Sequence, residues 1–164
     1  MGIGRKIGLN DDKGYAVAVF IALVVVALVI AGYYIVLRPQ PEAYDTIYVL
    51  DTNKQAVNYT ETLAANRNSS LTVFVGVVNK MGTSANYQVQ VKITQNLNIF
   101  PIDVPASAVY EKSGLRNGET WETSASITQN QPGDYAVVFE LYQQNTDGTY
   151  VFTNDYVVLK IQVS

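Results

Sequence analysis

An uncharged apolar run of 23 residues, from Tyr15 to Leu37, constrains this chain more than any other part of its sequence. A helix of that length measures about 35 Å, at about 1.5 Å per residue, and the hydrocarbon core of a bilayer is about 30 Å thick. The apolar part of a cleaved secretory signal is shorter, about 7–15 residues. We therefore expect residues 15–37 to form a transmembrane helix that is retained as a membrane anchor.

The orientation of this anchor follows from the charges beside it. Three basic residues precede the run and one closely follows it: Arg5, Lys6, Lys13 and Arg38. Because basic residues that flank a span favour the cytoplasmic side, residues 1–14 are expected to be a cytoplasmic flank. The prolines at 39 and 41 stop the helix. Residues 38–43 are then a linker, and residues 44–164 an extracellular domain on a single-span cell-membrane protein.

A second interpretation of the N-terminus stays open. In pilin-like proteins a short charged leader ends in Lys-Gly directly before an apolar helix, and Lys13-Gly14 before Tyr15 has this form. Cleavage after Gly14 would remove residues 1–14 and free the helix to pack in a filament.

Small residues in the apolar run favour contact with another membrane helix, because they let two backbones approach closely. The candidate contact residues are Ala22, Ala27, Ala31 and Gly32. The expected partners are therefore the membrane itself and other proteins of an envelope or membrane complex, with self-association as one form of such contact.

After residue 43 the pattern changes from helical to alternating. Apolar residues take every second position in five runs, and a shorter run precedes them: 71–77, 86–93, 121–127, 135–141, 157–163 and 45–50. This alternation is typical of strands with one buried and one solvated face, and turn-forming sequences such as NTDG at 145–148 separate the runs. We expect a mainly β chain, in which the N-terminal transmembrane helix precedes an antiparallel immunoglobulin-like β-sandwich of about seven strands.

Composition excludes several kinds of site. The chain has no cysteine and no histidine, which rules out disulfides, thiol nucleophiles and zinc sites built from those residues. From residue 39 onward, seven basic and twelve acidic residues give a net charge of −5. No basic stripe is present, so the sequence does not favour nucleic-acid binding.

Acidic residues offer few candidates for chemistry. A calcium loop starting at Asp51 lacks the glycine required at its sixth position, which is Ala56. Glu119 and Glu122 are three residues apart on an expected strand, so their side chains should point to opposite faces. These glutamates are interpreted as solvated edge charges. The same interpretation applies to two acids at hairpin and strand ends, Asp147 and Asp155. We expect no catalytic, cofactor-binding or metal-binding residues, no cofactor and no enzymatic activity.

Two glycosylation sequons fall in the expected outer domain, at Asn58-Tyr59-Thr60 and Asn68-Ser69-Ser70. Asn58 and Asn68 are therefore candidate modification sites. Trp121 is interpreted as a core anchor, with an exposed binding aromatic as the alternative. The twelve tyrosines of the chain suit a contact surface, and half-buried strand positions explain them equally well.

Four segments carry a family resemblance: Tyr48-Val49-Leu50, VFVGVVN at 73–79, GETWE at 118–122 and PGDYAVVFELY at 132–142. Residues 43–163 resemble an uncharacterised archaeal family of membrane-associated domains of unknown function. The resemblance implies a β-sandwich on the cell surface and no particular activity. The chain departs from the family in having one membrane span instead of several, and Asp51-Thr52-Asn53 where a Gly-Pro-type turn is more usual.

The sequence thus favours a non-enzymatic, single-span envelope protein whose outer β-sandwich makes protein–protein contacts within a membrane or surface assembly. Two alternatives remain. One is a pilin-like or strand-donating filament subunit. The other is a surface module that binds ions, or that binds carbohydrate through Trp121 and exposed tyrosines.

Overall fold

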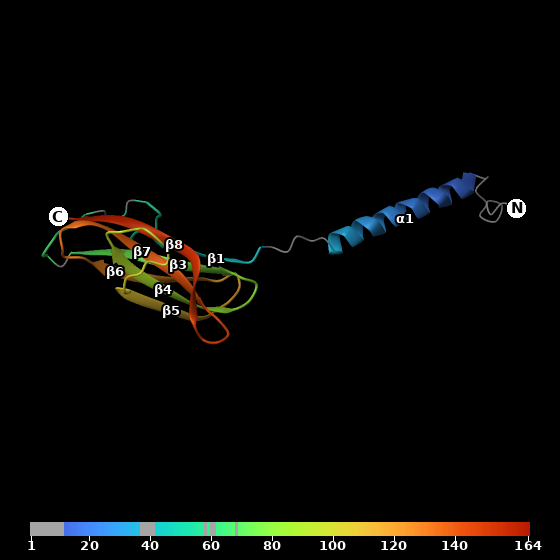
Figure 1. Ribbon diagram of the computed structural model, residues 1–164. Helices are drawn as coiled ribbons and strands as arrows, with labels where there is room; N and C mark the ends of the chain where they lie inside the picture. The colour runs from blue at the N-terminus through green and yellow to red at the C-terminus, as the bar shows by residue number, and fades with distance from the viewer. Residues whose placement is uncertain (1–11, 37–41, 58, 60–61, 68) are drawn as a thin grey trace. The chain divides into compact units, whose positions relative to one another are not determined.

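The computed structural model describes residues 12–36, 42–57, 59, 62–67 and 69–164 of the chain, which divides into two compact units, 1–41 and 42–164 (Figure 1). In the first unit, helix α1 spans Asp12–Val36. It begins three residues before the expected start at Tyr15, because a helical backbone can continue past the end of an apolar run. Leu37 and residues 38–41 lie outside the described residues, so the expected end of the helix stays a prediction.

The described residues of the second unit form eight strands. In chain order they are β1 Tyr44–Leu50, β2 Thr62–Leu63, β3 Ser70–Lys80, β4 Ala85–Thr94, β5 Ala108–Leu115, β6 Thr120–Thr128, β7 Gly133–Gln144 and β8 Tyr150–Val163. The expected mainly β fold with one N-terminal helix is confirmed. The strands beyond the six recognised by alternation are β2, which has only two residues, and β5, which precedes a glycine-containing turn.

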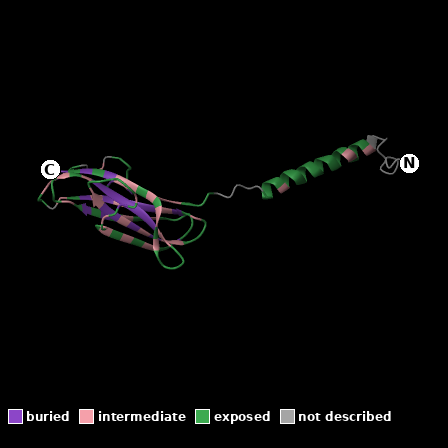
Figure 2. Cartoon of the chain, in the orientation of Figure 1, coloured by how far each residue is buried: buried purple, intermediate pink, exposed green. Residues whose placement is uncertain are grey.

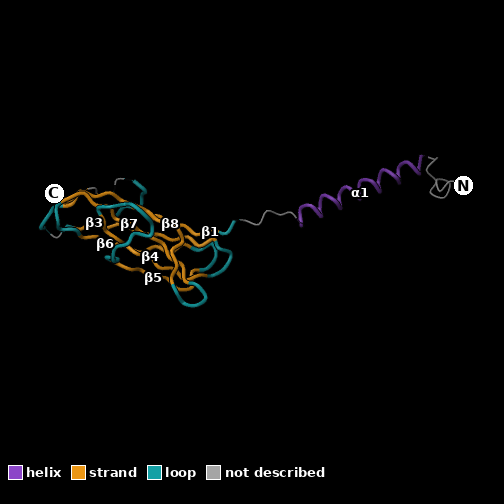
Figure 3. Tube along the Cα trace, viewed as in Figure 1, coloured by secondary structure: helices purple, strands orange, loops and turns teal. Residues whose placement is uncertain are grey.

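The strands form two sheets (Figures 1 and 3). The smaller sheet has the order β1-β3-β6, and the larger has the order β2-β8-β7-β4-β5. All pairs are antiparallel except β2 with β8. The hairpin expected at Asp147-Gly148 joins β7 to β8, and Gly148 takes a φ of +88°, a left-handed conformation that glycine adopts without strain.

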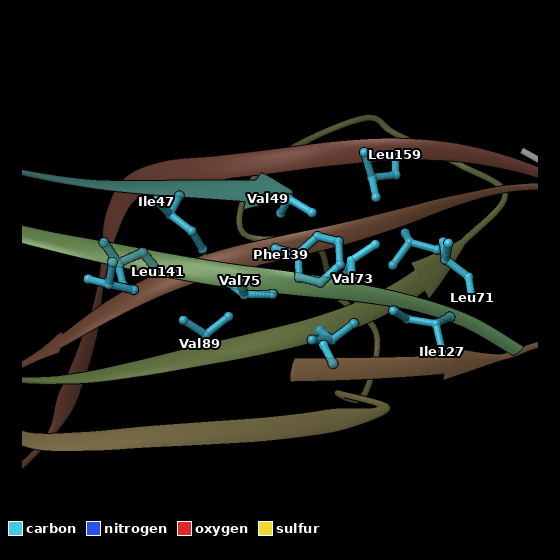
Figure 4. Packing of buried hydrophobic residues seen from close by; sticks show 14 of the residues in the cluster. Ile47, Val49, Leu71, Val73, Val75, Val89, Ile127, Phe139, Leu141 and Leu159 are labelled. Atoms are coloured by element: carbon cyan, nitrogen blue, oxygen red, sulfur yellow. The ribbon is translucent and has the colours of Figure 1, made fainter. Parts of the chain in front are cut away.

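The main core lies between the facing sides of the two sheets, where alternate residues of each strand are buried (Figures 2 and 4). Val73, Val75 and Val77 of β3 are fully buried, as are Phe139 and Leu141 of β7. Removing each such side chain from water contributes about 1.5–3 kcal/mol. Trp121 packs against this core while partly buried, which agrees with its interpretation as a core anchor.

A second, smaller cluster lies on the other face of the larger sheet, under the connection between β4 and β5. Ile102 of this connection packs with Ala136 and Val138 of β7. Beside them lies a buried polar group that we call the Lys92 cluster, formed by Lys92, Glu140 and Tyr142. The connection joins two neighbouring strands of the larger sheet, β4 and β5, and packs on the outer face of β7 and β8.

Every polar atom at the centre of the Lys92 cluster has a partner. The Lys92 ammonium lies 2.8 Å from a Glu140 carboxylate oxygen and donates to the Ile102 carbonyl oxygen at 2.7 Å. Glu140 accepts from the Ile102 backbone N–H and, at 2.8 Å, from the Tyr142 hydroxyl. Buried charges are tolerated when they are paired and hydrogen-bonded in this way. The cluster therefore fastens the connection to the sheet.

Candidate functional site

Helix α1 is long and apolar enough to cross a membrane, and none of its span from Gly14 to Val36 is buried (Figure 2). At about 100° of rotation per residue, the four candidate contact residues fall on two faces of the helix. Ala27 and Ala31 lie one turn apart on one face, and Ala22 and Gly32 lie toward the other. Contact with a partner helix would therefore use two separate pairs. The proposed cleavage position after Gly14 lies within the continuous helix.

Neither modification candidate can be located. Asn58 and Asn68 both lie outside the described residues, so their glycosylation stays a prediction. Their described neighbours belong to the connection between β1 and β3, where the Tyr59 hydroxyl donates to the Val49 carbonyl oxygen at 2.7 Å and the Ser69 hydroxyl to the Ala64 carbonyl oxygen at 2.9 Å.

The rejected calcium loop has a structural role instead. Asp51 is buried, and one of its carboxylate oxygens accepts from the backbone N–H groups of Asn53 and Gln55, at 2.9 and 2.8 Å. An aspartate that bonds the backbone two residues onward is a common turn-forming device. The carboxylate thus shapes the turn that follows β1.

The two glutamates around Trp121 have separate roles. Glu119 precedes β6 and accepts from the backbone N–H of Arg116 at 3.0 Å. Glu122 lies on the outer face of the smaller sheet, where it accepts from the Tyr48 hydroxyl at 2.8 Å and the Lys54 ammonium at 2.7 Å. These two hydrogen bonds, the one from Lys54 first, hold the pKa of Glu122 below its usual value.

Tyr48 lies over a glycine of the neighbouring strand. A Cβ atom added at Gly76 would lie 2.0 Å from the Tyr48 ring, so the glycine makes room for that ring. Lys54 also stands over the Phe74 ring, 5.0 Å from its centroid. We call Tyr48, Lys54, Phe74 and Glu122 the outer-face group, because together they present aromatic and charged atoms on the outer face of the smaller sheet.

A second polar group lies between the sheets, at the end where β1 begins. Asp45 of β1 and Asp155 of β8 line one pocket of about 400 Å³, which we call the mouth pocket. Gln143, Asn145 and Thr153 line it too. Burial, followed by the neighbouring Asp155 carboxyl, raises the pKa of Asp45 to about 6.

Tyr87 of β4 approaches Asp45 from inside the core. Its side chain is fully buried, and its hydroxyl has no hydrogen-bond partner among the described residues. Burial and the nearby Asp45 carboxylate raise the pKa of this hydroxyl. The hydroxyl therefore lies next to the carboxyl of Asp45 without a well-directed hydrogen bond to it.

The mouth pocket corrects one expectation from the sequence. Asp155 is not a solvated end-of-strand charge, because it is partly buried and lines the pocket together with Asp45. The signal was present for Asp45, which shares the core-facing alternation of Ile47 and Val49. The signal was present for Asp155 as well, because it continues the core-facing row of Val157 and Leu159 in β8.

Solved structures with the same fold include a CARDB domain of a Pyrococcus furiosus protein, determined in a crystal in complex with di-metal ions. The TM-score is 0.50 at 15% identity, over 76% of this chain and 96% of that one. A solution structure of the same domain matches at a TM-score of 0.50 and 16% identity, over 76% of this chain and 97% of that one. At this level of identity the likeness concerns the fold alone.

A β-glucosidase from Listeria innocua, in complex with isofagomine, matches with a TM-score of 0.48 and 17% identity. That match covers 76% of this chain and 16% of the enzyme. No curated protein matches the chain. Residues 38–164 match the family described as DUF1616, a domain of unknown function. Because the matched residues make up most of the chain, the chain belongs to the DUF1616 family.

Proposed function

We propose that this protein is a non-enzymatic, single-span envelope protein whose β-sandwich lies outside the cell and makes protein–protein contacts as a subunit or accessory of a membrane or surface assembly. The observation that carries the proposal is the pairing of an unburied apolar helix with a separate β-sandwich unit. An apolar helix of this length is stable in a bilayer, because its backbone groups bond within the helix and its side chains face lipid.

The outer-face group is the surface that best suits a protein partner. Tyrosine and phenylalanine supply rigid contact area there, and Lys54 and Glu122 pair with each other at 2.7 Å at the surface. Interfaces are enriched in aromatic residues and commonly have a polar rim. The close fit of Tyr48 over Gly76 holds the aromatic ring in place before a partner arrives.

The orientation of the domain is open to a direct experiment, because the chain has no cysteine. Ser113, exposed in β5, is changed to cysteine in one variant, and Gly4 in another. On intact cells, a membrane-impermeant maleimide is expected to label Ser113→Cys and to reach Gly4→Cys only after lysis. Labelling of Gly4→Cys on intact cells, with Ser113→Cys protected, would contradict the proposed orientation.

The assembly is tested on protein extracted from its native membrane in mild detergent. A chain that starts at Met1 or Gly2 and migrates with other proteins is the expected result. A lone monomer under these conditions would refute a role as a subunit. A mass that starts at Tyr15, together with filaments containing this chain, would favour the pilin-like alternative. Envelope glycans that change the fluorescence of Trp121 would favour the carbohydrate-binding alternative.

A further inference from the structure

The mouth pocket places two aspartates at core-facing positions without a positive charge of the chain to balance them. Asp45 continues the inward row of Ile47 and Val49, and Asp155 meets it from β8. In the described part of the chain, the ion pairs belong to Lys54, Lys92 and Arg116, and none includes either aspartate. Two like charges in a partly buried site repel each other. No described ion pair of the chain offsets this repulsion.

The groups that face the two aspartates are uncharged. Gln143 and Asn145, at the end of β7 and in the following hairpin, and Thr153 of β8 line the pocket, and their side chains carry oxygen atoms. Lys80, at the end of β3, stands over the Tyr44 ring at 5.6 Å from its centroid and makes no ion pair with the aspartates. The surroundings therefore supply oxygen atoms and no compensating charge.

The Tyr87 hydroxyl, which lies against Asp45 without a hydrogen bond of good geometry, is a second indication of a missing ligand. It is fully buried, faces Asp45 from β4 and has no hydrogen-bond partner among the described residues. Buried hydroxyls without partners are rare in folded proteins. A water molecule held by a bound cation, or a carboxylate oxygen turned by that cation, would give this hydroxyl an acceptor.

We propose that the mouth pocket binds one divalent cation of the calcium type, with the carboxylates of Asp45 and Asp155 as its charged ligands. Calcium takes six to eight oxygen ligands in flexible geometry, often including amide oxygens and water. Gln143 and Asn145 supply amide oxygens, and a pocket of about 400 Å³ leaves space for bound water. Tyr87 is a positioning residue, whose hydroxyl donates to a carboxylate or to a bound water.

Such a cation would join the first long strand of the domain to the last. Asp45 lies near the start of β1, which follows the linker to the membrane helix, and Asp155 lies in β8. Among the described strands β1 is hydrogen-bonded to β3 only, so no backbone hydrogen bond seen there connects it to β8. The cation would therefore strengthen the point at which the chain enters the domain. This inference does not depend on the protein-contact function proposed above.

The test uses the full-length chain in detergent, stripped of metal with EDTA and then transferred to EDTA-free buffer. Tb³⁺, a luminescent analogue of Ca²⁺ that also prefers oxygen ligands, is titrated into the protein. Its emission is followed on excitation of the tyrosines. We expect one saturable site whose emission is reversed by Ca²⁺. Asp45→Asn and Asp155→Asn should each weaken binding at least about tenfold, because charged ligands set calcium affinity. Asp134→Asn, an exposed aspartate of β7, is the matched control and should bind normally.

Circular dichroism of each variant verifies the fold, and Asp155→Asn provides the same test should Asp45→Asn fail to fold. Tyr87→Phe keeps the ring in the core and should weaken binding by a smaller factor than either aspartate variant. Absence of saturable binding in the wild-type chain would overturn the proposal. Equal affinity in the wild type and in the Asp45→Asn/Asp155→Asn double variant would overturn it too, since the cation would then bind elsewhere.

Discussion

The Lys92 cluster and the mouth pocket contain similar side chains, but only the Lys92 cluster has a positive charge beside its carboxyl group. The Lys92 cluster combines one buried carboxyl group with a tyrosine, and the mouth pocket combines two partly buried ones with a tyrosine. In the Lys92 cluster the chain supplies its own cation, and Glu140 accepts from both Lys92 and the Ile102 backbone. In the mouth pocket two aspartates meet, and the Tyr87 hydroxyl has no partner in the described chain. The difference separates a group that stabilises the fold from one that is available to a ligand.

Lys92→Met should give the largest effect. The substitution leaves Glu140 buried without its positive partner, and breaking a buried pair in this way costs about 3–5 kcal/mol. Urea unfolding of the full chain, followed through Trp121, measures the free energy. Lys160→Met removes an exposed lysine from the same sheet and is the matched control, expected within about 0.5 kcal/mol of wild type. A loss of unfolding free energy below about 1 kcal/mol for Lys92→Met would show that the Lys92–Glu140 pair does not hold the connection to the sheet.

Two tyrosine substitutions sharpen the comparison, because each removes one hydroxyl and keeps the ring. Tyr142→Phe deletes a donor to Glu140 at 2.8 Å and should cost about 1.5 kcal/mol, as is usual for a hydrogen bond to a charged group. Tyr87→Phe deletes a hydroxyl that has no partner in the described chain, so in EDTA it should change the unfolding free energy by less than about 0.5 kcal/mol. Equal losses in the two variants would contradict the contrast between the clusters.

Asp45→Asn should raise stability in EDTA at pH 8, the opposite sign to Lys92→Met. The pKa of Asp45 is raised from 3.8 to about 6. That shift corresponds to about 3 kcal/mol at 1.36 kcal/mol per unit, and solvent screening of a half-exposed group reduces it to about 1 kcal/mol.

The same shift sets a pH dependence. The folded state holds the proton of Asp45 more tightly than the unfolded chain, so this contribution to stability is fully present below pH 3.8 and is lost as the pH rises through about 6. Unfolding free energies measured in EDTA from pH 4 to 8 should therefore include a fall of about 1 kcal/mol in the wild type that Asp45→Asn lacks. Identical profiles for the two proteins would contradict the assignment to Asp45.

Much of the architecture was predictable because it depends on local patterns. The apolar run identified α1, and the period of two identified six of the eight strands, including Tyr135–Leu141 within β7. The connection before β5 was not predictable in detail, because its packing depends on Ile102 meeting Ala136 and Val138 across a long separation in sequence. Lys92 and Glu140, 48 positions apart, gave no sign of pairing for the same reason.

The candidate site was the least predictable part of the molecule. Alternation places Asp45 on the inward face of its strand, but it does not say what stands opposite. The same is true of Asp155, which continues the inward row of Val157 and Leu159 in β8. Only the stacking of β1 against β8 brings the two carboxyl groups to one pocket, with Tyr87 of β4 behind them.

The sequence alone determined the apolar membrane-length helix, the mainly β domain and the exclusion of cysteine and histidine chemistry, because composition and short-range periodicity are properties of neighbouring residues. The tertiary structure decided which charges are balanced and which are not. That balance depends on distances between strands far apart in the chain, and the strength of a charge interaction is set by separation in space and by burial. Glu140 and Asp45 are both acidic residues on strands. Only the folded domain shows that Glu140 pairs with Lys92 and that Asp45 lines a pocket.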